Sequence, residues 1–242
     1  NARHPAEAGQ PMEMDWDLRL GFHQARIECG IRLENMHGEL QLRGQSQGHA
    51  FTSLGELDIS SLLFENFQFT DVKGPIQLDN HRLLLGSWVA RSQRSPDGSP
   101  ATSPRPIEAR LFGGQFLLNA WIAPKHSPCY SLNAGLIDAD LAQFAKQTMP
   151  GPQDLKGRVG LTLDLRGRVP SINGMEGEGR VWLRDGDVYQ LPVMVSILKI
   201  LSLREPDSSA FSEADMRFRI AGKHVYLSPI SFNGDAISLL GQ

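Results

Sequence analysis

The chain has 242 residues, of which 40% are hydrophobic and 21% are charged, so its composition is that of a folded protein and excludes extended disorder. The 24 Lys and Arg residues and 27 Asp and Glu residues give a formal net charge of -3, and the basic residues are scattered singly. This balance provides no basic surface that could follow a phosphate backbone, so nucleic acid is not expected as a partner.

Membrane-spanning and targeting signals do not stand out in this sequence. No stretch has the roughly 18 consecutive apolar residues that cross a bilayer, and no signal peptide opens the chain. The sequence begins at Asn1 without Met and ends directly after an apolar strand pattern. We therefore expect a piece of a longer protein, with any anchor outside this piece.

Alternation with a period of two residues dominates the chain. Near the start, six apolar side chains alternate with polar residues or Gly and so share one face of a predicted strand: Met12, Met14, Trp16, Leu18, Leu20 and Phe22. The pattern returns along the whole sequence and predicts roughly fifteen strands, most of them about four to eight residues long. Dipeptides typical of tight turns, such as Asn173-Gly174 and Asp185-Gly186, separate several of these runs.

This pattern predicts a mainly β fold: an extended, curled antiparallel sheet of repeated hairpins that forms a β groove, with one or two short amphipathic helices. Open twisted sheets of more than about ten strands tend to curl or split. A closed sandwich, in which a second sheet buries the apolar face, is the alternative that the sequence leaves open. In the open groove the apolar face stays accessible, which is typical of a surface that binds a ligand or partner.

Three segments interrupt the strand pattern. Residues 91–106 are rich in Ser and Pro and predict an exposed loop. Residues 136–149 predict a short surface helix with Asp138 or Asp140 as its N-cap. Residues 191–203 predict a helix with a broad apolar face, about 18 Å long and therefore too short to span a bilayer. Most simply it lies against the dry face of the sheet, and contact with a membrane surface is the alternative.

The sequence predicts no enzyme, cofactor or metal site. The seven His residues have no HxxxH or HExxH spacing, and no GxSxG motif is present. Cys29 and Cys129 are a hundred residues apart without a CxxC motif, which suits either a disulfide in an oxidising compartment or two free thiols.

An open groove predicts contact with acyl chains. The side chains expected to make that contact are the inward members of the strongest alternating runs, and none of them would do chemistry. They are Phe116, Leu118, Leu161, Leu163, Leu165, Val181, Leu183, Met216, Phe218 and Ile220.

Several stretches together resemble the C-terminal region of AsmA-like proteins, a family that includes the TamB-related bacterial envelope proteins. The stretches are ARLFGGQF (109–116), YSLNAGLIDADLAQF (130–144), LKGRVGLTLDLRG (155–167), GEGRVWLRDGDVYQLPVMVSILKIL (177–201) and FSEADMRFRIAGKHVYLSPISFNGDAISLLGQ (211–242). The resemblance is best over residues 107–242, while GIRLENMHGELQLRGQSQGHAF (30–51) resembles the β units that precede that region. It divides the chain into an N-terminal part of the groove (1–90), a loop (91–106) and an AsmA-like C-terminal region (107–242).

The resemblance implies a periplasmic protein of a diderm bacterium, anchored in the inner membrane by a segment that this sequence lacks. It implies phospholipid or another acyl lipid as the cargo, carried between the inner and outer membranes, with proteins of either membrane as further partners. The alternative function is a scaffold for assembly of outer-membrane proteins, in which an exposed strand edge pairs with a client strand.

Overall fold

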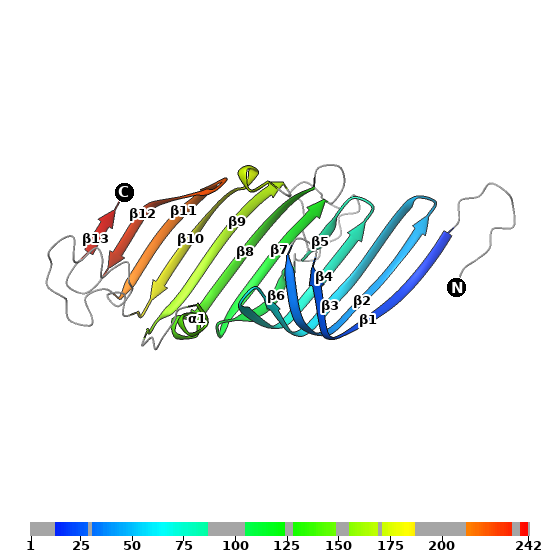
Figure 1. Ribbon diagram of the computed structural model, residues 1–242, viewed down its shortest axis with the longest axis horizontal. Helices are drawn as coiled ribbons and strands as arrows, with labels where there is room; N and C mark the ends of the chain where they lie inside the picture. The colour runs from blue at the N-terminus through cyan, green and yellow to red at the C-terminus, as the bar shows by residue number, and fades with distance from the viewer. Residues whose placement is uncertain are drawn as a thin grey trace, which may run out of the picture. The chain divides into compact units, whose positions relative to one another are not determined.

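The computed structural model describes residues 13–28, 31–86, 105–123, 128–148, 155–168, 171–186, 212–233 and 238–241. These residues form strands, one α-helix and one short 3-10 helix (Figure 1). In chain order the elements are β1 (Glu13–Glu28), β2 (Arg32–Gln47), β3 (Ala50–Phe64), β4 (Phe67–Asp79), β5 (Leu83–Leu85), β6 (Ile107–Leu111), β7 (Gly114–Ala123), β8 (Cys129–Asp140), α1 (Leu141–Thr148), β9 (Arg158–Arg168), η1 (Ile172–Gly174), β10 (Glu176–Arg184), β11 (Glu213–Ala221), β12 (His224–Asn233) and β13 (Ser238–Gly241).

The strands belong to one 13-stranded sheet with the order β1-β2-β3-β4-β5-β7-β8-β9-β10-β11-β12-β13. Apart from the step from β5 to β7, each strand of this order pairs with the next strand in the sequence, and the ladders from β1 to β5 and from β9 to β13 are antiparallel. This is the arrangement that successive hairpins produce. The predicted fold class, a mainly β protein with a large antiparallel sheet, is confirmed.

The short strands β5 and β6 share one position in the sheet, between β4 and β7. β5 pairs with β4 at Ile76 to Leu78 and with β7 at Ala120 to Ile122, and β6 also pairs with both neighbours. Gly74 permits the close approach of β6, because a Cβ atom there would lie 2.8 Å from the Pro106 carbonyl oxygen. Most of the loop predicted at 91–106 lies outside the described residues.

The chain divides into two compact units. Unit 1 comprises Asn1–Ala109, Leu117–Leu132 and Arg168–Pro170, and unit 2 comprises Arg110–Phe116, Asn133–Gly167 and Ser171–Gln242. In unit 1 buried side chains of neighbouring strands meet on one face: Ile59 is fully buried, and the buried Val72 lies directly opposite it on β4. Burial of these aliphatic groups stabilises the sheet of unit 1.

The prediction that most strands are about four to eight residues long was wrong, since β7 to β12 have 9 to 12 residues and β1 to β4 are longer still. β1 to β4 are 13 to 16 residues long rather than four to eight. The backbone ladder continues through positions where the apolar alternation fades, such as Gly44 in β2. There the ring of Trp16 on β1 covers the glycine, since a Cβ atom on Gly44 would lie 2.5 Å from the Trp16 Cζ2.

Helix α1 begins five residues later than the start of the predicted helix at 136–149, because residues 136–140 continue strand β8. The Ala142 N–H donates to the Asp140 carboxylate at 2.8 Å, so Asp140, one of the two predicted caps, is the N-cap. The other, Asp138, has a left-handed backbone with φ of 53° and lies within β8. The helix predicted at 191–203 lies outside the described residues.

Replacing Asp140 by Ala removes the acceptor for the Ala142 N–H, and we expect the free energy of unfolding to fall by about 1 kcal/mol. Asp140→Ser keeps an oxygen acceptor and should lose much less. Urea denaturation followed by circular dichroism measures both values. Equal losses for the Ala and Ser variants would contradict the capping role.

Candidate apolar binding face

Strands β9 to β12 of unit 2 present one continuous apolar face. The register places Leu161 opposite Val181, Val181 opposite Met216, and Met216 opposite Ile230, so one row of apolar side chains crosses four strands. Three further rows run beside it, and in two of them β10 contributes Gly177 or Gly179, which have no side chain. We name the whole set the C-terminal apolar face: Val159, Leu161, Leu163, Leu165, Val181, Leu183, Ala214, Met216, Phe218, Ile220, Val225, Leu227, Ile230 and Phe232.

Eight of the ten side chains predicted to contact acyl chains lie together on this face. They are Leu161, Leu163, Leu165, Val181, Leu183, Met216, Phe218 and Ile220. No position of the C-terminal apolar face carries a charged side chain. The strict two-residue alternation of the strands explains this agreement, because it fixes the face of each side chain once the register is set.

The two other predicted residues lie on β7, and Phe116 belongs to unit 2 while Leu118 belongs to unit 1. Leu118 alternates with Ala120 and Ile122, which lie opposite Leu85 and Leu83 of β5. Both predicted residues are half-buried. No described pairing places either of them in the rows of β9 to β12.

The opposite face of the same strands carries the charges. Arg166 and Glu176 lie opposite each other and form an ion pair at 2.8 Å, and Arg180 contacts Asp215 at 2.6 Å. The hydrogen bond and the charge of Asp215 raise the pKa of the Arg180 guanidinium. These exposed pairs are worth little individually, but they leave the two faces of the sheet with opposite chemical character.

Helix α1 packs on one end of the C-terminal apolar face. Leu141 and Ala145 of α1 form a buried cluster with Leu155 and Leu183, and Phe144, Val159, Ala214 and Phe232 pack against it. Leu183 is only 6% exposed, which makes it a core residue. The row nearest the helix therefore stabilises the fold. The burial of Leu183 under α1 does not support the prediction that this side chain contacts a ligand.

Away from α1 the face stays partly open to solvent. Leu161, Leu163 and Leu165 are half-buried, while Val225 and Leu227 expose 59% and 49% of their surface. The described strands belong to a single sheet, so within these ranges no second sheet covers the face. Partial exposure of a contiguous apolar surface is typical of a binding surface rather than of a closed core.

Two glycines shape the open part of the face. A Cβ atom on Gly179 would lie 2.4 Å from the Phe218 Cζ, and one on Gly177 would lie 2.9 Å from the Leu165 Cδ1. The phenyl ring and the leucine therefore lie across the backbone of β10 instead of standing away from it. Methyl groups and ring carbons therefore lie close to the backbone of the sheet at these two positions.

Unit 1 has a similar surface that the predicted contact residues do not include. The N-terminal apolar face is formed in register by β1, β2, β3, β4 and β5. Its members are Met14, Trp16, Leu18, Leu20, Phe22, Leu40, Leu42, Phe51, Leu57, Ile76, Leu78, Leu83 and Leu85. Met14, Leu18 and Leu20 are exposed by 43%, 42% and 39%. The alternation of apolar and polar residues at 12–22 is the feature of the sequence that could have indicated this second surface.

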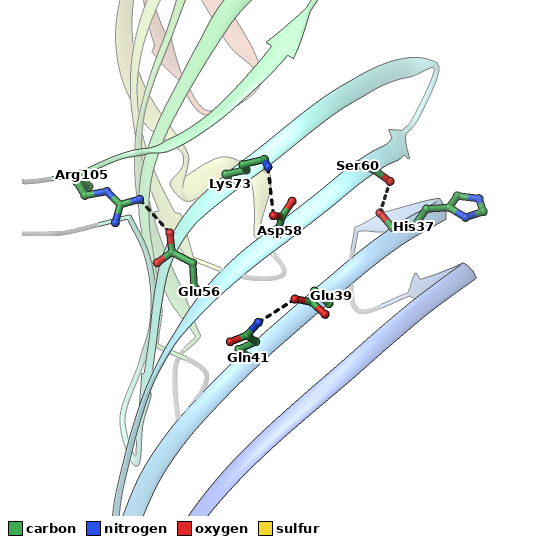
Figure 2. A network of polar contacts seen from close by, with 8 residues as sticks. All are labelled: His37, Glu39, Gln41, Glu56, Asp58, Ser60, Lys73 and Arg105. Carbon is green, nitrogen blue, oxygen red and sulfur yellow. Dashed lines mark hydrogen bonds and ion pairs between the residues drawn. The ribbon is translucent and has the colours of Figure 1, made fainter.

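Polar contacts in unit 1 gather around β2 to β4 (Figure 2). Lys73 pairs with Asp58 at 3.1 Å, Arg105 pairs with Glu56 at 2.9 Å, and Gln41 donates to Glu39 at 2.8 Å. All three contacts join side chains of the surface opposite the N-terminal apolar face. Lys73 and Asp58 lie opposite each other and favour the register of β3 with β4, and none of the three contacts joins a nucleophile to a base.

A polar depression of about 460 Å³ lies in unit 2, lined by Gly113, Gly114, Gln115, Ile137, Asp138 and Arg158. Arg158 donates to the Asp138 carbonyl oxygen at 3.3 Å. With one apolar side chain in its lining, this depression does not suit an acyl chain.

Groups of three or more metal-ligating side chains and membrane-spanning helices are absent from the part of the chain that the structure describes. No three His, Cys, Asp or Glu side chains there gather in a way that could hold a metal ion. No helix within the described ranges is long and apolar enough to cross a membrane. Cys129 is a free, half-buried thiol at the start of β8, and Cys29 lies outside the described residues.

In comparisons with known proteins, no family model, no curated protein and no solved structure matches this chain. The assignment to the AsmA-like family therefore stays a prediction from the residues quoted above.

The variants Leu183→Ala and Leu163→Ala should differ in free energy of unfolding, because Leu183 lies in the covered part of the face and Leu163 in the open part. Leu183→Ala leaves a cavity beside α1, and we expect the free energy of unfolding to fall by about 3 kcal/mol. Leu163→Ala removes half-exposed groups and should cost about 1 kcal/mol. Urea denaturation measures both, and equal losses would show that Leu163 is also a core residue.

Proposed function

We propose that the protein is a non-enzymatic lipid carrier whose C-terminal apolar face binds the acyl chains of phospholipids. The observation that carries this proposal is the apolar surface that crosses the four strands β9 to β12. It has no charged side chain and is partly open to solvent. Exposure of such a surface to water is unfavourable, and its contact with a hydrocarbon chain is favourable.

The dimensions of the face suit acyl chains. The three rows away from α1 extend over about 13 Å along the strands, and the four strands over about 14 Å across them. Burial of each methylene contributes about 0.8 kcal/mol, so one fourteen-carbon tail could contribute on the order of 10 kcal/mol before entropic costs. No bond needs to form or break, since burial of the tail accounts for the binding.

Transport between the inner and outer membranes, in the periplasm of a diderm bacterium, is the setting that we propose on the resemblance to AsmA-like proteins. In that setting the protein is anchored to the inner membrane by a segment outside this sequence, and proteins of the two membranes are its further partners. Fractionation of cells that produce the full-length protein tests the location independently of lipid binding.

Placing a carboxylate on the open part of the face should abolish lipid binding. Leu163→Asp puts a charge among the apolar rows, and desolvating it against an acyl chain costs several kcal/mol. We expect transfer of fluorescent phosphatidylethanolamine between vesicles to fall by roughly tenfold or more. Native mass spectrometry of the purified protein should show phospholipid on the unaltered chain and little on this variant.

Thr162→Asp is the matched control, because Thr162 is the neighbouring residue on the same strand, exposed on the opposite face. It adds the same charge and should leave binding and transfer unchanged. Equal loss in both variants, or no phospholipid bound to the unaltered chain, would contradict the proposal. Thermal melting checks that both variants fold, and unfolding of Leu163→Asp alone would indicate a closed core.

A further inference from the structure

Two histidines of unit 1 lie side by side on β1 and β2, on the surface opposite the N-terminal apolar face. The ladder between the two strands is regular up to the pair Phe22 and Gly38, so the next position sets His23 opposite His37. The centroids of the two imidazole rings are 5.1 Å apart, and their planes are nearly perpendicular, at 88°. The histidines form no motif in the sequence, because only the strand register brings them together.

The backbone around the two histidines is held by a β-bulge and a hydrogen bond. Gln24, directly after His23, has a left-handed backbone with φ of 53°, and the register with β2 shifts at this point. On β2, the Ser60 hydroxyl donates to the His37 carbonyl oxygen at 3.0 Å. The His37 ring points away from this contact and from the neighbouring ion pairs (Figure 2). Bulges often direct a side chain out of the regular ladder, and here the backbone is fixed while the ring stays available.

The distance between the rings fits two ligands of one metal ion. A bond of about 2.0 to 2.1 Å from metal to nitrogen places the ion about 3.2 Å from the centroid of each ring. Two rings bound at roughly the tetrahedral angle have centroids about 5 Å apart, in agreement with the observed 5.1 Å. The torsion of the imidazole ring about its bond to Cβ is soft. Each ring can therefore turn one nitrogen toward a shared ion without movement of the strands.

The surface beside the two histidines has room for an ion and its water ligands. Gly21 precedes His23 on the same face, and a Cβ atom on Gly21 would meet no other atom within 4 Å. His23 itself is exposed, and His37 is half-buried. An ion can therefore reach both rings from solvent.

The positive charges on either side of this position are already paired. Arg19 contacts Glu39 at 3.7 Å, and Arg26 contacts Glu34 at 3.6 Å. These carboxylates offset the repulsion that the two guanidinium groups would exert on a cation. The field at the two histidines is therefore not strongly positive.

The number and type of ligands indicate which ions the site could take. Among the described residues, no group of three or more His, Cys, Asp or Glu side chains gathers here, so water would complete the coordination. Imidazole suits Cu²⁺, Zn²⁺ and Ni²⁺, whereas Mg²⁺ and Ca²⁺ prefer oxygen ligands. For a given set of nitrogen ligands, Cu²⁺ binds most tightly in this series.

We propose that His23 and His37 together bind one divalent transition-metal ion, with Cu²⁺ preferred over Ni²⁺ and Zn²⁺. The ion would connect β1 to β2 at the bulge, where the backbone ladder is irregular. The site lies on the opposite surface of the sheet from the N-terminal apolar face. It is independent of the lipid-binding proposal.

Calorimetric titration with metal ions tests the site. The untagged chain is used with Cys29 and Cys129 replaced by Ser, because thiolates also bind these metals. It should bind Cu²⁺ more tightly than Zn²⁺ and should not bind Mg²⁺. His23→Ala and His37→Ala should each weaken Cu²⁺ binding by roughly tenfold or more, since even the loss of a group that only supports a ligand costs about that much. The double variant should lose little more than either single variant, because both remove the same site.

His224→Ala is the matched control. His224 lies on β12 of unit 2, and its aromatic neighbour is Tyr226, with ring centroids 6.2 Å apart. This variant should bind Cu²⁺ as the unaltered chain does. Electron paramagnetic resonance of the copper-loaded chain should show coupling to two imidazole nitrogens, and to one fewer after either substitution at His23 or His37.

No binding of Cu²⁺ to the unaltered chain would overturn the proposal, and so would unchanged binding in His23→Ala and His37→Ala. Loss of a different ion in each single variant would show two separate histidines rather than one shared site, and would also contradict it. His23→Gln and His37→Gln keep a polar side chain and should show the same losses as the Ala variants. Circular dichroism checks that every variant keeps its strand content.

Discussion

The antiparallel backbone ladder is the constraint on which the rest of this structure depends. It assigns alternate side chains to opposite faces, and every additional strand extends both faces at once. Within the described residues, such a ladder presents more apolar surface than the eight-residue helix α1 covers. Since α1 covers only one end of the apolar face of β9 to β12, the rest of that face stays partly open to solvent.

Face assignments could be predicted within each regular stretch of strand, because alternate residues share a face until a bulge shifts the register, as it does between Met216 and Phe218. The register of the ladder then brings Leu161, Val181 and Met216 into one row across three strands. The predicted cap Asp140 follows equally local rules, since its carboxylate needs only a neighbouring free N–H. Strand ends were harder to predict, because a ladder continues through glycines such as Gly44 as long as its partner strand continues.

Burial could not be read from the pattern, and neither could the placing of β5 and β6 in one position of the sheet. Leu183 and Leu163 occupy equivalent positions in an alternating run, yet only Leu183 lies under α1, which is a tertiary contact. The sharing of one sheet position by β5 and β6 depends on the close approach of Pro106 to Gly74, which no local signal encodes. The ion pair between Asp17 and Arg43 could be found only once the register between β1 and β2 was known.

The split position between β4 and β7 has a consequence for how such a protein can change over evolutionary time. Since β5 and β6 are each held by both neighbours, the chain that joins them can lengthen without breaking the ladder. Doubling the length of a connection between two fixed strand ends costs only about 0.6 kcal/mol in closure entropy. The fold can therefore accept an insertion between β5 and β6, because the strands on either side stay paired without it.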